Sequence, residues 1–531
     1  MNLFRRLQAA VQAFRFAGQS KTAARSPRSD SDPFWMFPWG SSGRGGYRGG
    51  QLDRMSADWR PGTIGPNRMF AMDGKLLRER AWDLYLNNPW AKSAVESYVA
   101  NVIECGIIPH RNHLENGEDW SKAWDRWGGL TAHSTREADL TGEQTIYGLQ
   151  QTWLREILVG GGCLIHFVDR PRRSQRIPIS LELIPEERFA DHLQTVPGNP
   201  KTANRIHQGH EIDPATGRTV AYHVLKSHPN DLTHDPLATV RLARETCEYG
   251  YMKERTGQKR GTTLLKQALR WIWSLGYITD NELDASTLKS QWAYMITTAT
   301  PSNDDNGVQS QDGYLTDLAG NKIDEHQSGM IWHGSPEDEI KGTGPNVPGG
   351  DAVTWVTLIQ ESIAIGANLS WQELTRNYGK ANFSAARMTR GGDKKRFRPM
   401  QDFSICHFGN PTVERFDRAA VGALTPGFPS PTQYLQERDE LLDAQDWQAP
   451  GWESPNPKDD ATANHQRIAD KLVSRTEIAG TEGRSWKKSR KLLESEQREL
   501  EDSGLAATAE PAPSSAPEET PEDSPEQQET E

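Results

Sequence analysis

Apolar residues recur at helical spacing along most of the chain and alternate with polar residues in one central stretch. Positions three and four apart predict amphipathic helices, whereas strict alternation predicts strands. Asn88 and Pro89 predict a helix start, because asparagine caps helices and proline fits the first turn. The early helices are predicted at 75–87, 89–105, 118–128 and 147–158. The strands are predicted at 158–168, 179–184 and 205–225, the last range holding two strands around a turn at 213–217.

Farther along, two long helical stretches enclose a polar insert. The first, 259–296, contains no proline, and the second spans 351–369, with a Gly-, Asp- and Asn-rich insert at 297–350 between them. Some 35 residues of helix would make a rod of roughly 50 Å. A projecting hairpin of this length is hard to bury within one subunit, so we expect it to pack against neighbouring copies. The apolar positions predicted to pack there are Leu265, Leu269, Ile272, Leu288, Trp292, Val353, Val356 and Ile359.

A basic junction follows the second long helix. Ser370 and Glu373 have the spacing of a helix-capping box, and a basic loop at 376–383 leads into a helix from 384 to about 408. Two interpretations of the basic residues stay open. They form a solvated loop and helix face, or they contact DNA phosphates without reading sequence. The candidates for phosphate contact are Arg376, Lys380 and Arg387.

Charge is distributed unevenly over the 531 residues. The net charge is −11, yet residues 1–50 carry eight Arg or Lys against two Asp, and residues 508–531 carry eight Asp or Glu and no base. A protein that grips duplex DNA over a broad face needs clustered positive charge, which the body of the chain lacks. The 18 Trp suit cores and protein–protein contacts. The composition disfavours a sequence-specific DNA binder, and the acidic end is predicted to be disordered.

Motifs for catalysis are missing from the sequence. It contains neither the G-x-x-x-x-G-K-[ST] phosphate loop nor the G-x-S-x-G nucleophile elbow. The four cysteines lie far apart, which excludes a cysteine-rich zinc module. His110 and His113 are better explained as surface histidines than as metal ligands. We predict no catalytic residues, no cofactor and no metal, and no apolar run is long enough to cross a membrane.

The order of several sequence blocks resembles the lambda-type portal proteins of tailed bacteriophages. The resemblance covers roughly 75–500. Three positions depart from the family pattern: Glu104-Cys105 replaces the first glycine of the V-x-G-x-G-I-x-P element, Ala385 replaces a serine, and Asn456 replaces an aspartate. The blocks that carry it are RERAWDLYLNNPWAKSAVESYVANVIECGIIP (78–109), GHEIDPATGRTVAYHVLKSHP (209–229), ERTGQKRGTTLL (254–265), NYGKANFSAARM (377–388) and DWQAPGWESPNPKDDATANHQRIADKLVSRTEIAG (446–480).

The resemblance implies an α+β, mainly helical portal fold with wing, stem, clip and crown, assembled as a ring, usually of twelve subunits, around a central channel. It implies the following division: a flexible basic arm at 1–74, wing at 75–258, first stem helix at 259–296, clip at 297–350, second stem helix at 351–369, tunnel loop at 370–383, wing and crown helices at 384–505, and an acidic tail at 506–531.

The implied function is structural: a ring at the unique capsid vertex through which DNA is packaged and ejected. The implied partners are further copies of the chain, the terminase large subunit, the major capsid protein and scaffold, the head–tail connector, and non-specifically held double-stranded viral DNA, with no membrane. The implied location is the virion, after assembly in the host cytoplasm. Two alternatives stay open, a DNA-end-processing enzyme and a scaffolding or minor capsid protein. Electron microscopy for rings distinguishes them.

Overall fold

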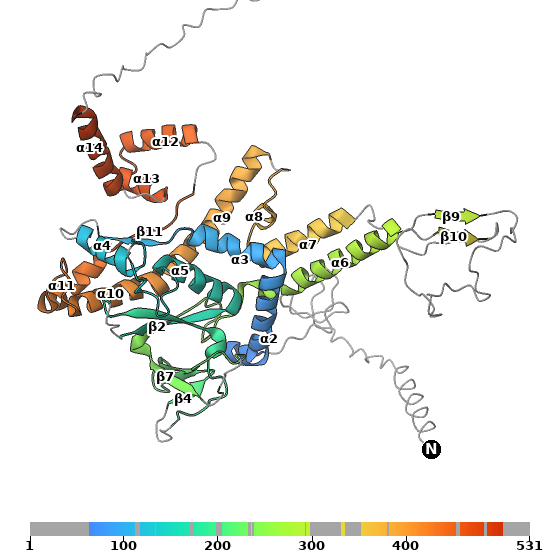
Figure 1. Ribbon diagram of the computed structural model, residues 1–531, viewed down its shortest axis with the longest axis horizontal. Helices are drawn as coiled ribbons and strands as arrows, with labels where there is room; N and C mark the ends of the chain where they lie inside the picture. Colours follow the sequence, from blue (N-terminus) through green and yellow to red (C-terminus); the bar gives the residue numbers. More distant parts are fainter. Residues whose placement is uncertain are drawn as a thin grey trace, which may run out of the picture. The chain divides into compact units, whose positions relative to one another are not determined.

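The computed structural model is dominated by helices, with two sheets of three and four strands in the first half of the chain (Figure 1). It describes residues 63–111, 117–132, 134–169, 175–197, 204–231, 235, 238–291, 294–297, 331–334, 352–379, 382–452, 457–482 and 486–502. The arm up to residue 62, most of the predicted clip and the acidic tail lie outside these ranges.

The first helices follow the sequence pattern closely. Helix α2 (Pro66–Asn87) begins nine residues before the predicted start at Lys75, with Pro66 in its first turn. Helix α3 (Pro89–Val102) is capped as predicted, because the Asn88 side chain accepts a hydrogen bond from the Trp90 N–H at 3.0 Å. Helices α4 (Gly117–Trp127) and α5 (Ile146–Arg155) follow.

The strand predicted at 158–168 begins later than expected. Residues Glu156–Gly160 form a π-helical turn (η3) that continues α5, and strand β2 is Gly162–Val168. A short apolar run does not distinguish a buried helical turn from a strand, which explains the error. Gly161, with φ of 101°, ends the helical turn in a conformation that suits glycine. The change from helix to strand therefore falls at three consecutive glycines: Gly160 ends η3, Gly161 is the turn, and Gly162 begins β2.

Two antiparallel sheets form the β part. The three-stranded sheet has the order β3-β2-β8, with β3 at Ser180–Pro185 and β8 at Cys247–Tyr251. The four-stranded sheet has the order β4-β5-β6-β7. Its strands are β4 (Arg205–His207), β5 (His210–Ile212), β6 (Thr219–Leu225) and β7 (Thr239–Ala243).

The range 205–225 thus holds three strands, whereas the pattern predicted two. The additional hairpin turns at Gln208 and Gly209, whose φ angles are 52° and 78°. A two-residue hairpin of this type needs positive φ at both central positions. Glutamine is an unusual residue there, so the turn has no clear signal in the sequence. The predicted turn at 213–217 does connect β5 to β6.

The two long helices are present but shorter than predicted. The first is preceded by a 3-10 turn, η6 (Leu264–Gln267), and consists of α6 (Leu269–Gln291); the second is α7 (Ala352–Gly366). Residues 294–296, predicted as helix, belong to strand β9 (Tyr294–Thr297), which pairs in parallel with β10 (Ile331–Gly334). The run of Tyr, Ile and Thr there favours a strand. Helices α6 and α7 lie side by side, and β9 and β10 follow at their far end (Figure 1).

The remaining chain is helical. Helix α8 (Trp371–Thr375) is short, and α9 (Phe383–Ser404) continues through a π-helical turn, η7 (Ile405–Gly409), into α10 (Asn410–Gly422). Strand β11 (Asp446–Gln448) pairs with β1 (Ile108–His110). The other helices are α11 (Pro431–Asp443), α12 (Pro457–Ala469), α13 (Arg475–Thr481) and α14 (Trp486–Asp502).

Tryptophan fills the subunit's own core. Trp120, Trp124 and Trp127 lie along one face of α4, and their ring centroids are 5.0 to 5.7 Å from that of Phe416 on α10. Trp153 of α5 packs in the same way on Phe403 and Phe408. Aromatic pairs of this geometry each contribute about 0.5–1.5 kcal/mol beyond the area they bury. Among the described residues, the exposed tryptophans are on α6 and α7: Trp271, Trp273 and Trp355.

Candidate nucleic-acid interface

The predicted tunnel loop begins at a well-anchored short helix. Ser370 caps α8, since its hydroxyl accepts a hydrogen bond from the Glu373 N–H at 3.2 Å. The predicted capping box is only half formed, because the Ser370 N–H donates to Asp393 Oδ1 of α9 at 3.1 Å. The Glu373 carboxylate accepts from Asn101 and Tyr378 instead, each at 3.1 Å. These bonds connect α8 to α3 and α9.

Arg376 ends α8 in a left-handed conformation, with φ of 55°. Its side chain is exposed, and Asn377 stabilises the following turn by accepting a hydrogen bond from the Gly379 N–H at 3.1 Å. Lys380 lies outside the described residues. The described part of the loop therefore presents one exposed cation next to a rigid helix end.

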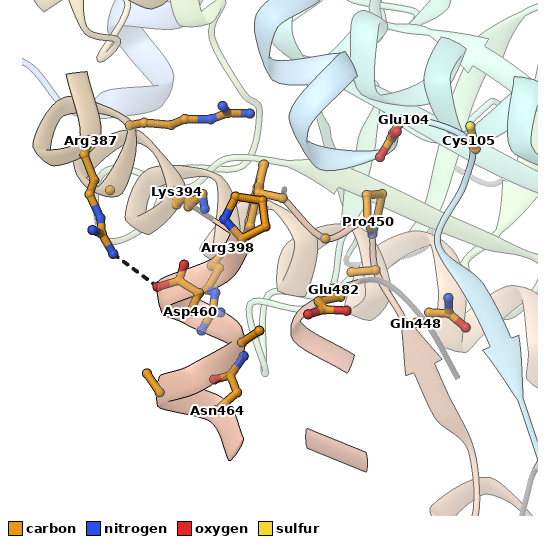
Figure 2. A pocket seen from close by; sticks show the side chains of 18 of the residues that line it. Glu104, Cys105, Arg387, Lys394, Arg398, Gln448, Pro450, Asp460, Asn464 and Glu482 are labelled. Atoms are coloured by element: carbon orange, nitrogen blue, oxygen red, sulfur yellow. Dashed lines mark hydrogen bonds and ion pairs between the residues drawn. The ribbon is translucent and has the colours of Figure 1, made fainter. Parts of the chain in front are cut away.

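Arg387 lies in a different setting from Arg376. It extends from the first turns of α9 and forms an ion pair with Asp460 of α12, with 3.2 Å between Nη2 and Oδ1 (Figure 2). Both side chains are about half exposed, so the pair contributes little stability, in the range of about 0–1 kcal/mol. The structure thus places Arg387 at the edge of a cleft between α9 and α12.

The cleft itself has a volume of about 1070 Å³ and is bounded by α9, α12 and the segment after β11. Its basic side chains on α9 are Arg387, Arg390, Lys394 and Arg398, and α12 adds Arg467. Glu104, Asp460 and Glu482 also line it, so the five cations exceed the three acids by two.

The surroundings of Lys394 show how positive charge is distributed in the cleft. Its ammonium group lies 5.8 Å from the centroid of the Trp452 ring, in cation–π geometry. Trp452 is fixed in turn, because its indole N–H donates to Asn101 Oδ1 at 3.0 Å. Burial lowers the pKa of Lys394, and the nearby cations Arg390 and Arg398 lower it further. Positive charge is therefore concentrated on this face of α9.

Sequence reasoning identified Arg387 but did not predict the cleft. Arg390, Lys394 and Arg398 occur at i, i+4 and i+8 in α9, a spacing that places them on one helix face. This spacing could have shown the basic stripe in advance. The contribution of α12 could not be predicted, because it depends on contacts between segments far apart in sequence.

The predicted stem residues divide between core and surface. Leu265, Leu269, Ile272 and Ile359 are buried in the subunit's own core, and Val356 packs partly against it. Val353 is 69% exposed. Trp292 and the side chain of Leu288 lie outside the described residues. The face of α7 that packs on its own subunit is the one containing Ile359 and Ile363.

Within the described ranges, no group of three or more metal-ligating side chains is present. His407, next to Cys406 in sequence, pairs with Glu248 at 3.2 Å. Of the helices that the structure describes, none is long and apolar enough to span a membrane.

Comparison with known proteins now identifies the family. The family model described as "Phage portal protein, lambda family" matches residues 52–401, about two thirds of the sequence. The chain belongs to the lambda family of phage portal proteins. Membership indicates a structural rather than a catalytic role. No curated protein matches the sequence.

Solved structures with a distant likeness come from gene transfer agent particles. A chain from the neck of an empty particle, computed with C6 symmetry, is 12% identical, with a TM-score of 0.36, covering 78% of this chain and 93% of that one. A chain from the neck of a native particle, computed with C12 symmetry, is 11% identical, with a TM-score of 0.35, covering 81% and 97%.

Proposed function

We propose that this chain is the subunit of a portal ring, usually of twelve copies, at the capsid vertex of a phage-like particle. The ring serves as the conduit for packaging and ejecting double-stranded DNA. In this proposal, 75–258 and the helices after 384 form wing and crown, 259–296 and 351–369 form the stem, and 297–350 forms the clip. The clip docks the terminase large subunit and later the head–tail connector, and the wing faces the major capsid protein and scaffold.

The observation that carries the ring is the apolar surface of α6 and α7. Trp273 and Trp355 are each 61% exposed, and the rings of Trp273 and Tyr277 stack at 5.8 Å on the outside of α6. Large apolar side chains gathered on two adjacent helices are typical of an interaction surface. The others exposed there are Trp271, Ile278, Leu283, Val353, Leu358 and Ile365.

A closed ring accounts for this surface. Copies related by rotation bury one helix pair against the next, through a heterologous contact that closes on itself. Substituting Trp273 and Trp355 by Glu tests the proposal, with Leu435→Glu on the exposed side of α11 as control. Twelve copies of the 59.5 kDa chain have a mass of about 714 kDa, which mass photometry resolves from a monomer. We expect wild type and control to form rings and the double variant to remain small. Rings of unchanged mass in the double variant would refute the stem contact.

Arg376 and Lys380 are proposed to touch DNA phosphates weakly in the channel. Arg387, the third candidate, is paired with Asp460 at the edge of the cleft and is the least suited of the three to this role. The affinity for duplex DNA rises with the number of phosphates that are neutralised. A few cations on a mostly acidic protein therefore bind the duplex weakly, and it can still slide through the channel. Replacing Arg376 and Lys380 together by Ala is expected to shorten the packaged DNA or lower phage yield, whereas Arg126→Ala on α4 is not. Unchanged packaging in the double variant would exclude this role.

A further inference from the structure

Three basic side chains on one face of α9, the basic stripe, lower the stability of that helix. Arg390, Lys394 and Arg398 are spaced by four residues, and like charges at this spacing destabilise a helix. Among the described residues, none of the three has an ion-pair partner, whereas Arg387 has Asp460 and Arg396 has Asp393. Positive charge concentrated in this way is offset when an anionic group binds.

One wall of the cleft leaves the backbone of α9 accessible to a ligand. Gly391 lies between the basic side chains, and a Cβ atom added there would meet nothing within 4 Å. The helix backbone is therefore open to close approach at this point. Gln448, Pro450 and Trp452 also line the cleft. Figure 2 shows Gln448 and Pro450 on the side of the cleft opposite Lys394 and Arg398.

We propose that the cleft binds the acidic C-terminal segment of this chain, residues 508–531. This segment carries eight Asp or Glu and no Lys or Arg. Carboxylates pair strongly with arginine, which offers several donors in a fixed plane. A segment with so many charged and so few apolar residues cannot form a core of its own, so it becomes ordered only when it binds a partner.

The segment can reach the cleft. Glu482, at the end of α13, is already part of the cleft wall, and α14 ends at Asp502. The 29 residues beyond Asp502 span up to about 95 Å when extended. Because the segment belongs to the same chain, its effective concentration near the cleft is in the millimolar range, so weak individual contacts suffice.

Duplex DNA is the competing occupant, and the cleft suits it less well. The duplex carries one negative charge per about 1.7 Å of its axis. Glu104 and Glu482 on the cleft wall repel such a density of charge more than they repel eight carboxylates spread over 24 residues.

Carbodiimide cross-linking of the full-length protein tests the proposal, because it joins carboxylates to lysines that they contact. Lys394 and Lys395 are neighbours, but Lys394 lines the cleft and is partly buried, whereas Lys395 is exposed on another face of α9. Cross-linked peptides are identified by mass spectrometry in the absence of DNA. Random encounters would favour Lys395, the more accessible lysine.

We expect cross-links from 508–531 to Lys394 to exceed those to Lys395 at least threefold. Substituting Arg390 and Arg398 together by Gln should reduce the Lys394 cross-links severalfold while circular dichroism stays unchanged. Equal yields at the two lysines, or Lys394 yields unaffected by the double substitution, would overturn the proposal. A segment that cross-links to neither lysine would equally overturn it and leave duplex DNA as the better candidate. None of these outcomes depends on whether the chain forms a ring.

Discussion

Arg260 donates a hydrogen bond from Nε to Glu186 Oε1 across 2.6 Å, and neither side chain has exposed surface. The guanidinium also donates to the Glu186 backbone carbonyl at 2.9 Å and lies over the rings of Phe70 and Phe189. Tyr249 donates to the other carboxylate oxygen at 2.9 Å. Because Phe70 belongs to α2 and Tyr249 to β8, this pair connects α2 and the three-stranded sheet to the segment that precedes α6.

Removing Arg260 should therefore destabilise the subunit strongly. Arg260→Ala leaves the Glu186 carboxylate buried without its charge partner, which costs about 3–5 kcal/mol. Arg255→Ala, on an exposed side chain of the same segment, is the matched control and should cost less than about 1 kcal/mol. Chemical denaturation measures both. A small effect of Arg260→Ala would mean that the pair does not stabilise the fold.

Two glycines are expected to respond in opposite directions to alanine. A Cβ on Gly261 would lie 1.8 Å from the Gly161 carbonyl oxygen, so Gly261→Ala must displace the backbone. Gly391 lies within α9 with open space around its Cβ position, so Gly391→Ala should stabilise the helix by up to about 1 kcal/mol. Thermal unfolding should show a lower midpoint for the first variant and a higher one for the second. Similar midpoints would contradict the close approach of the two backbones.

Glu156 is expected to make stability depend on pH. Its Oε2 atom is buried without a hydrogen-bond partner, and burial, together with Glu187 and Glu186, raises its pKa to about 8. The folded chain then holds a proton that the unfolded chain releases above pH 4.5, so stability falls as pH rises from about 4.5 to 8.

The substitution Glu156→Gln should remove this loss of stability at high pH. At pH 9 we expect its unfolding midpoint to exceed that of wild type by several degrees, on the scale of about 2–4 °C per kcal/mol, and the difference to vanish near pH 4.5. Glu79→Gln, on the exposed side of α2, serves as control and should show no such trend. A constant difference across the pH range would contradict a raised pKa at Glu156.

Local sequence signals predicted the parts of the fold that depend on local chemistry. Asn88 caps α3 as expected, and the spacing of Leu265, Leu269 and Ile272 identified buried positions in η6 and α6. The predictions failed where contacts between segments far apart in the sequence determine the local conformation. The turn η3 is helical because it continues α5 within the core, and the Gln208 turn is imposed by strand pairing. The basic cleft requires α12, whose position against α9 no spacing rule predicts.

Electron microscopy of the purified full-length protein tests the central claim most directly. The account predicts closed rings, with the α6–α7 pairs arranged around a central channel and their exposed Trp273 and Trp355 side chains buried between neighbouring copies. Monomers or open, irregular assemblies under conditions where the subunit is folded would contradict it.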